Sequence, residues 1–418
     1  MVGTSRRRGR PVDGSLHHEL VPTRGLFRAC RPPIYLGFAA TLWTGPTWTR
    51  LRRDGELMQR DLKPGGLEAP SIAGVGKAAP AHYYDQETLI AALRSLWGRR
   101  HFNLDRLEEL HRNVLVGGRH LALPIDEYER LETWGQANDA WIRVAQEVGE
   151  AAVRDALAAA GLAPADVGAL IFVTVTGVAT PSIDARLINR MDLPPGIMRL
   201  PIFGLGCVAG AAGLARAADY VRAYPERVAV LLSVELCSLT LQHSDLSVPN
   251  LVASGLFGDG AAAAVITGAA RCANGPRIVA SRSIFYPNSE RVMGWDISEQ
   301  GFRVVLSADV PRVVLEHVRR DVDAFLAEQG LERSEIAAWI SHPGGPKVLL
   351  ALGEALELPA EALALSWKTL REVGNLSSAS VLLVLKETIE SVRPAPGSYG
   401  LVLAMGPGFC SELVLLRW

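Results

Sequence analysis

Three side chains suited to chemistry stand where one regular element ends and another begins. The first, Cys207, follows an apolar run at 198–203 and precedes a helical pattern at 208–224. A thiol at a helix N-terminus faces unpaired N–H groups and the positive end of the helix dipole, and both favour thiolate over thiol. Cys207 is therefore a candidate nucleophile, although a free cysteine can equally be a small buried hydrophobe.

A nucleophilic cysteine needs a basic or cationic partner and a group that stabilises an oxyanion. His342 ends an apolar run at 337–341 and enters a glycine-rich loop, which is where α/β folds build their sites. Asn375 stands between Gly374 and a helical pattern at 376–392, where its alternative role is an N-cap. Six other histidines lie in helical or polar surroundings and are expected to be solvated: His17, His18, His101, His111, His120 and His317.

The segment 204–209 also satisfies the dinucleotide-binding pattern G-x-G-x-x-A. Glu235, at the end of the next expected strand, would then be the acidic residue that contacts a ribose. Such a unit normally opens its domain, whereas this one comes late in the chain. A dinucleotide-binding module is therefore a rival interpretation that the position of the motif argues against.

The elements that position these residues repeat along the chain. Hydrophobic periodicity predicts helices at 86–98, 104–116, 134–161, 183–191 and 208–224, with strands at 169–174, 198–203, 228–234 and 261–267. The last part repeats the order, with a helix at 311–330, a strand at 337–341, a helix at 376–392 and strands at 400–404 and 412–416. We predict two copies of a βαβαββ unit, which would bring Cys207, His342 and Asn375 to one centre.

Composition places the chain among ordinary soluble globular proteins. Of its 418 residues 49% are apolar and 21% charged, and the net charge is −1, which excludes a disordered, collagen-like or disulfide-scaffold chain. The apolar stretch at 34–48 is shorter than the roughly 20 residues that a membrane-spanning helix needs, and glycines interrupt it. Five scattered cysteines without CxxC spacing predict no disulfide framework, no metal site and a cytoplasmic location: Cys30, Cys207, Cys237, Cys272 and Cys410.

We divide the chain into three parts. Residues 1–68 hold 12 Lys and Arg against 6 Asp and Glu and show no sustained period. They are expected to be a disordered extension or the result of a wrongly assigned start codon, with Met58 as the alternative start. The positive charges lack interleaved aromatic residues, and no nucleic-acid partner is expected. Residues 69–270 form a first half that carries the cysteine, and residues 271–418 form a second half that carries the histidine and the asparagine.

From residue 69 to its end, the chain resembles the type III polyketide synthases, the chalcone and stilbene synthase-like family of the thiolase superfamily. Five segments carry the resemblance: Gly-Cys-Val-Ala-Gly at 206–210, Leu-Phe-Gly-Asp-Gly-Ala at 256–261, Ile-Ser-His-Pro-Gly-Gly-Pro at 340–346, Gly-Asn-Leu-Ser-Ser at 374–378 and Gly-Pro-Gly at 406–408. The resemblance implies an α/β thiolase-like fold with two pseudo-symmetric halves in αβαβα layers. It also implies a homodimeric acyltransferase that uses acyl-CoA and malonyl-CoA and needs no cofactor.

The resemblance also implies a role for each residue of the centre. Cys207 would take the starter acyl group from its CoA thioester, and its thiolate would be paired with His342. His342 and Asn375 would stabilise the enolate that remains when malonyl-CoA loses CO2. This enolate would extend the acyl chain in a decarboxylative Claisen condensation. Phe257 would be the gatekeeper between a CoA tunnel and the reaction cavity, with a core phenylalanine as the alternative.

Further positions follow from the same resemblance. The substrate cavity would be lined by Val175, Thr176, Cys237, Thr240, Val304 and Ser377. The loops that shape the site would contain Gly344, Gly345, Pro346, Gly406, Pro407 and Gly408. Candidates for CoA binding are Arg106, Arg112, Arg119 and Lys347, although Glu109 and Asn113 stand where the family commonly has basic residues. Thr180 replaces the methionine that plant members insert into the cavity of the partner subunit.

The starter is expected to be a long-chain fatty acyl-CoA, extended by malonyl units and released as an alkylpyrone or alkylresorcinol. Residues 293–310 resemble the bacterial alkylpyrone and alkylresorcinol synthases, and the small Val304 implies an open cavity. Two alternatives stay open. One is a ketoacyl synthase III-type enzyme that acts on acyl carrier protein, and the other is a tetrahydroxynaphthalene-type synthase that uses malonyl-CoA as its starter.

Overall fold

The computed structural model describes residues 69–97, 104–271 and 273–418, and the statements below refer to this part of the chain. The expectations for residues 1–68, His101 and Cys272 lie outside the described residues. Within them, no helix is long and apolar enough to cross a membrane.

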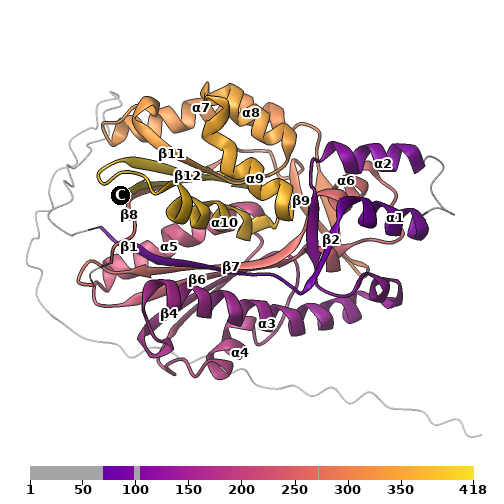
Figure 1. Ribbon diagram of the computed structural model, residues 1–418, viewed down its shortest axis with the longest axis horizontal. Helices are drawn as coiled ribbons and strands as arrows, with labels where there is room; N and C mark the ends of the chain where they lie inside the picture. Colours follow the sequence, from indigo (N-terminus) through magenta and orange to yellow (C-terminus); the bar gives the residue numbers. More distant parts are fainter. Residues whose placement is uncertain (1–68, 98–103, 272) are drawn as a thin grey trace, which may run out of the picture. The chain divides into compact units, whose positions relative to one another are not determined.

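Nine strands of the described residues form one mixed sheet (Figure 1). They are β1 (Ser71–Ala78), β4 (Val167–Thr174), β5 (Met198–Phe203), β6 (Val228–Leu236), β7 (Asp259–Thr267), β8 (Arg277–Phe285), β11 (Ile336–Ser341), β12 (Tyr399–Gly406) and β13 (Cys410–Arg417). Their order is β11-β12-β13-β8-β1-β7-β6-β4-β5. Two short hairpin-like pairs, β2 (His82–Asp85) with β3 (Gly118–Leu121) and β9 (Met293–Ser298) with β10 (Gly301–Leu306), lie outside this sheet.

The strand order has a pseudo-two-fold axis between β1 and β8. Outward from this junction the first half runs β1, β7, β6, β4 and the second half runs β8, β13, β12, β11. In both halves the strand that follows the long helix is parallel to the next strand inward, and the last strand of the half is antiparallel to its neighbours. The predicted repeat and the predicted α/β thiolase-like fold are therefore confirmed, with β5 as an addition to the first half.

The helices are α1 (Gln86–Trp97), α2 (Leu104–Asn113), α3 (Trp134–Ala160), α4 (Ile183–Arg190), α5 (Ala209–Ala223), α6 (Val248–Leu256), α7 (Val310–Glu328), α8 (Pro346–Leu356), α9 (Ala364–Val373) and α10 (Ser380–Glu387). In Figure 1, α3 covers one face of the first half, α7 and α8 lie beyond the second half, and α5 and α10 lie between the two halves. This arrangement gives the five layers α, β, α, β and α.

Both faces of β4, β6 and β7 are buried, and this explains their continuous apolar runs. In β4, Leu170 and Phe172 belong to the core that packs against α3, whereas Ile171 and Val173 belong to the central core formed with α5 and α10. A third core packs α7 and α8 against the outer face of the second half. The alternation of side chains along each strand thus distributes one sequence run over two cores.

Helix α3 is set by its sequence at both ends and along its buried face. A capping box between Thr133 and Gln136 starts it, and Gly161 in the left-handed conformation ends it. Its middle lies directly on β1, where a Cβ on Gly76 would come within 2.2 Å of the backbone N of Ala156. Only glycine in the strand and alanine in the helix allow this close approach.

Some elements differ from the sequence prediction. The helix expected at 376–392 consists of a 3-10 turn (Ser377–Ala379), α10 and a π turn (Thr388–Val392). The periodicity did not predict β1, β8, β9 or β10, because strands such as Ser71–Ala78 contain glycines and polar residues instead of an apolar run. Helices α6, α8 and α9 were also missed, because each is short and follows a proline or a loop.

Candidate active site

Three chain segments bring the predicted residues together. Cys207 lies in the 3-10 turn Gly206–Val208 that leads into α5, His342 follows β11 directly, and Asn375 follows α9. All three are buried, and together with Phe257 they line one small cavity of about 30 Å³. The expectation that the two halves meet at a shared centre therefore agrees with the geometry.

Both ring nitrogens of His342 lack a hydrogen-bond partner among the described residues. Its backbone N donates to Leu403 O at 2.8 Å, which fixes the residue at the end of β11. Burial lowers the pKa of His342 to about 3, so the imidazole is neutral. A neutral imidazole offers one N–H donor and one acceptor nitrogen to whatever enters the cavity.

The Asn375 side chain is held at both of its polar atoms. Its Oδ1 accepts from Ser377 N at 2.8 Å, and its Nδ2 donates to Gly344 O at 3.2 Å. Asn375 is not the N-cap of the following turn, which is Leu376, but its Oδ1 supports that turn and leaves the amide N–H groups as donors. The Asn375 side chain also hydrogen-bonds to Cys207 and there lowers the pKa of the thiol, so the asparagine and the nucleophile are in contact.

The Cys207 thiol differs from the expected thiolate. Burial raises its pKa to about 12, the hydrogen bond from Sγ to Ser377 Oγ at 3.6 Å opposes this rise, and the nearby Glu235 adds to it. The structure has no hydrogen bond between Cys207 and His342 within the described residues. The expected hydrogen bond between Cys207 and His342 is thus not formed, and loss of hydration opposes the favourable helix N-terminus at this thiol.

The predicted glycine loops pack tightly around the nucleophile. Gly206 has φ +55°, and a Cβ there would lie 2.8 Å from Cδ of Pro407. A Cβ on Gly406 would lie 2.6 Å from the backbone N of Val208. The second loop contributes Gly344 O as the acceptor for the asparagine amide, and Pro346 begins α8. The loops thus fix the thiol and the asparagine from opposite sides.

Glu235 is an unexpected member of the site. It is fully buried, and its Oε2 accepts from Val175 N at 3.0 Å and from Thr176 Oγ1 at 2.9 Å. Its Oε1 accepts from Ser378 Oγ. Burial raises its pKa to about 7, against the effect of these hydrogen bonds. The acidic residue that the dinucleotide pattern suggested is thus enclosed beside Cys207, where it cannot contact a ribose.

The charge of Glu235 gives a testable pH dependence. Above pH 7 the carboxylate is ionised and raises the pKa of Cys207, so Glu235→Gln should lower that pKa and speed alkylation by iodoacetamide severalfold at pH 8. Below pH 6 the carboxyl is protonated in the parent protein, and the two alkylation rates should converge. Peptide mass spectrometry measures the alkylation rate of Cys207 in the variant and in the parent protein. A ratio of these two rates that is the same at pH 8 and below pH 6 would contradict this account.

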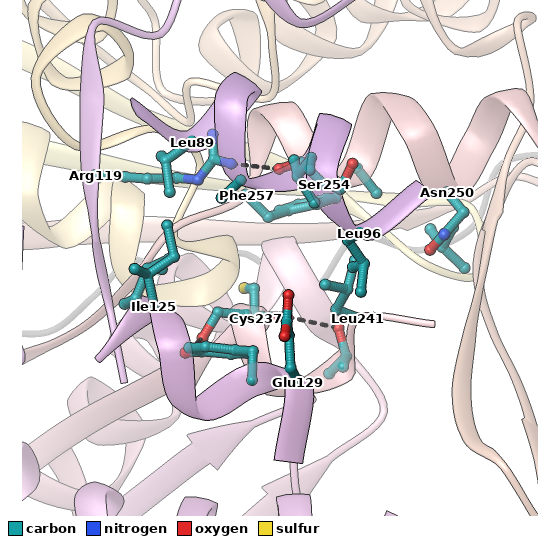
Figure 2. A pocket seen from close by; sticks show the side chains of 18 of the residues that line it. Leu89, Leu96, Arg119, Ile125, Glu129, Cys237, Leu241, Asn250, Ser254 and Phe257 are labelled. Carbon is teal, nitrogen blue, oxygen red and sulfur yellow. Dashed lines mark hydrogen bonds between the residues drawn. The ribbon is translucent and has the colours of Figure 1, made fainter. Parts of the chain in front are cut away.

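The predicted cavity residues surround two connected spaces. A cavity of about 30 Å³ is lined by Val175, Thr176, Cys237, Val304 and Ser377 together with Cys207 and Phe257. A larger cavity of about 310 Å³ adjoins it and is lined by Thr240, α1 and α6 (Figure 2). Four residues border both spaces: Cys237, Phe257, Trp295 and Val304. Trp295 was not among the predicted cavity residues, although it lies in the segment 293–310.

The apolar character of the larger cavity comes from several elements. Leucines of α1 and of the segment after residue 240 form much of its wall, as Figure 2 shows for Leu89, Leu96 and Leu241. Charged side chains, Asp126 and Glu129, lie at its edge. The cavity is thus suited to hold a chain of low polarity.

The four CoA candidates separate into exposed and buried residues. Arg106 pairs with Glu109 at 2.7 Å and Arg112 with Glu87 at 2.9 Å, both on the surface, and Lys347 is exposed in the first turn of α8. Arg119 is only 3% exposed. The expectation that it grips CoA phosphates is wrong, because β3 turns its side chain inward and its donors already bind protein oxygens.

His111 also corrects an expectation. It is 0% exposed instead of solvated, with Nε2 at 2.9 Å from Leu251 O and 3.1 Å from Ser254 Oγ. Burial lowers its pKa to about 4. Helical surroundings in the sequence did not reveal this, because α2 packs its histidine side directly against α6.

Comparison with known proteins identifies the family. The pattern described as "Chalcone and stilbene synthases, N-terminal domain" matches residues 68–270, and the corresponding C-terminal domain matches residues 277–418. The chain belongs to the chalcone and stilbene synthase family. It is a type III polyketide synthase, an acyltransferase-type condensing enzyme, and the dinucleotide-binding interpretation is therefore wrong.

Individual relatives span most of the chain. A 1,3,6,8-tetrahydroxynaphthalene synthase of Streptomyces peucetius subsp. caesius is 52% identical over 351 residues, which cover 83% of this chain and 93% of the relative. A putative chalcone synthase of Bacillus subtilis (strain 168) is 37% identical and covers 83% of this chain and 98% of that protein. The crystal structure of a tetrahydroxynaphthalene synthase from Streptomyces coelicolor A3(2) matches with a TM-score of 0.79 at 33% identity, over 83% of this chain and 99% of that one.

Proposed function

We propose that this polyketide synthase uses malonyl-CoA both as starter and as extender and forms a tetrahydroxynaphthalene-type aromatic product. The observation that carries the proposal is the 52% identity to a tetrahydroxynaphthalene synthase across 351 residues. The resemblance of residues 293–310 to alkylpyrone synthases concerns mainly the β9–β10 pair. A local likeness in one hairpin weighs less than an identity that spans both halves of the fold.

Loading of the starter begins from neutral groups. The acceptor nitrogen of His342 takes the proton of the Cys207 thiol as the sulfur attacks the thioester carbonyl. The bond between the carbonyl carbon and the CoA sulfur then breaks, and the CoA thiolate recovers the proton from the imidazolium. The acyl group now rests on Cys207, and His342 is again neutral.

Extension uses the donors of the centre. The N–H groups of His342 and Asn375 donate to the thioester oxygen of a malonyl-CoA, so that its C–CO2 bond breaks and the electrons pass to an enolate. The enolate carbon attacks the acyl carbon on Cys207, and the thiolate leaves. The product is a CoA thioester that is longer by a two-carbon unit, and release of CO2 draws the step forward. These steps need no metal and no organic cofactor.

The shape of the cavities supports a small starter. The space beside Cys207 measures about 30 Å³, which suits a short acyl unit. The adjoining space of about 310 Å³ gives the growing chain room past Cys237 and Val304. The apolar lining of this larger space also favours a second candidate function, in which a fatty acyl starter occupies it.

The test is to incubate the purified protein with malonyl-CoA alone and with added acyl-CoA starters from acetyl to long-chain fatty acyl, and to identify products by mass spectrometry. We expect an aromatic product from malonyl-CoA alone. A product that appears only with long-chain starters would support the second candidate.

Val304→Phe narrows the passage between the two cavities and should shorten the products. Ile297, on the same hairpin, is 61% exposed, and Ile297→Phe should not change product length. No polyketide from any starter would refute the proposal.

We also propose a homodimer in the cytoplasm. β5 is an end strand of the described sheet and exposes apolar side chains, with Met198 at 36%, Leu200 at 37% and Phe203 at 46%. An apolar edge strand invites pairing with a second chain. The described cysteines are free, as in a reducing compartment. Sedimentation equilibrium should give twice the chain mass, and a monomer at micromolar concentration would contradict the dimer.

A further inference from the structure

Three buried polar side chains converge on the C-terminal end of α6, just before Phe257. They are Gln86 from the first turn of α1, His111 from α2 and Arg119 from β3, with exposures of 6%, 0% and 3%. A buried arginine is rare unless its donors are satisfied. The hydrogen-bond partners of the Arg119 guanidinium therefore show which part of the fold the three side chains hold in place.

The acceptors of the cluster are backbone oxygens of α6. The Arg119 guanidinium donates to Ser254 O and Gly255 O, as Figure 2 shows for Ser254. Arg119 also donates to Gln86 Oε1 at 2.9 Å, and Gln86 Nε2 donates to Gly255 O at 3.2 Å. The last carbonyls of a helix have no partner within the helix, and a cation there is also favoured by the helix dipole. The cluster thus acts as a side-chain cap that fixes the end of α6.

The end of α6 is joined to the catalytic asparagine by two backbone hydrogen bonds. Asn375 N donates to Leu256 O at 2.9 Å, and Gly258 N donates to Asn375 O at 3.0 Å. The two segments are closely packed here, because a Cβ on Gly374 would lie 2.7 Å from Leu256 O. Phe257 lies between these two bonds. A shift of the helix end would therefore displace Phe257 and Asn375 together.

The backbone of Cys207 is held by a different element, although its Sγ also contacts Ser377 and Asn375. Its turn leads into α5 and packs against Pro407 of the second half. Displacement of the α6 end would therefore act on the decarboxylation donors more than on the thiol. This difference separates a positioning role from a general contribution to folding.

We propose that Arg119, together with Gln86 and His111, is a positioning residue for decarboxylation that sets Asn375 and Phe257 through the C-terminus of α6. The inference rests on the proposed function, because it assigns Asn375 to enolate stabilisation. The buried charge is balanced by Asp259, whose carboxylate accepts from Ala122 N and Ser238 N. Arg119 thus has a second, electrostatic anchor in Asp259, independent of the α6 carbonyls.

The test compares Arg119→Met with Arg333→Met. Arg333 likewise donates to the last carbonyl of a helix, Leu356 O of α8, but that helix end does not line the cavities around Cys207. Two rates are measured: CO2 release from malonyl-CoA in a Cys207→Ala background, and alkylation of Cys207 by iodoacetamide in the intact background. Arg119→Met should slow CO2 release by about 10²-fold, the effect of a misplacement near 1 Å, and leave alkylation within about twofold. Arg333→Met should change neither rate.

A milder variant keeps the inference testable if Arg119→Met does not fold. Gln86→Leu removes one link to Gly255 O without burying an unpaired charge, and it should lower CO2 release while leaving alkylation unchanged. Arg119→Lys should fall between the parent and Arg119→Met, because one ammonium cannot span three acceptors in the geometry of a guanidinium. Equal loss of both rates, or no loss of either, would overturn the positioning role. Absence of CO2 release from the parent protein would instead refute the proposed function.

Discussion

Cys207→Ala should abolish polyketide formation, by at least about 10³-fold, while malonyl-CoA decarboxylation continues. In the proposed mechanism the enolate forms at His342 and Asn375, which the substitution leaves in place, but it has no acyl-cysteine to attack. Two readouts on one sample separate the steps: product by mass spectrometry and CO2 release from malonyl-CoA. The released enolate should then be protonated, so acetyl-CoA is the expected product of the variant.

The matched control for this substitution is Cys410→Ala. Cys410 is a free, half-buried cysteine whose Sγ bonds Pro407 O at 3.2 Å, and it does not line the two cavities around Cys207. Its replacement should leave product formation close to that of the parent protein. Polyketide formed by Cys207→Ala at a rate comparable with the parent would contradict the assignment of the nucleophile.

Asn375→Ala should lower malonyl-CoA decarboxylation by about 10²- to 10³-fold, the usual cost of removing one oxyanion donor. Asn375→Asp tests whether the site needs the hydrogen-bond donor of the Asn375 amide. An aspartate can still accept from Ser377 N and support the turn, but it places a negative charge where the enolate oxygen develops. Both variants should therefore lose CO2 release, and both should keep a Cys207 that iodoacetamide can alkylate.

Asn189→Ala, on the exposed face of α4, is the control for this pair. It should not change CO2 release. Full decarboxylation by Asn375→Asp would show that support of the turn alone explains the asparagine, and would remove it from the chemistry.

The sequence was sufficient to predict that Cys207, His342 and Asn375 meet in one cavity, because this candidate centre coincides with element boundaries. Cys207, His342 and Asn375 each stand at the end or the start of an expected element, and the repeat of the two halves places them together. Sheet order then follows from the same repeat. Strands of alternating or glycine-containing sequence, such as β1 and β8, were missed because their burial depends on neighbours that no local pattern reveals.

Properties that depend on burial could not be predicted from the sequence. The ionisation state of Cys207 is one case, because the local helix N-terminus favours thiolate whereas the surrounding protein removes the hydration that a thiolate needs. Arg119 is another, because the four residues of β3 are too few to show which side chains face inward. Glu235 and Trp295 joined the site through tertiary contacts alone.

The starter was the least accessible feature. Residues 293–310 predicted a fatty acyl starter, whereas two of the relatives are named tetrahydroxynaphthalene synthases. The larger cavity beside Cys237 and Val304 is formed where α1, α6 and the β9–β10 pair meet, and not by one segment. Val304 lines this volume, yet its size alone does not determine what enters it.

The most direct test of the account is to locate the acyl group on the protein. After incubation with malonyl-CoA, trypsin cleavage after Arg199 and Arg216 places Cys207 on a peptide separate from that of Cys237. Mass spectrometry should find a malonyl-derived adduct on the Cys207 peptide, and none on that peptide in Cys207→Ala. An adduct on the Cys237 peptide instead, or product formation without any adduct on Cys207, would contradict covalent catalysis by Cys207.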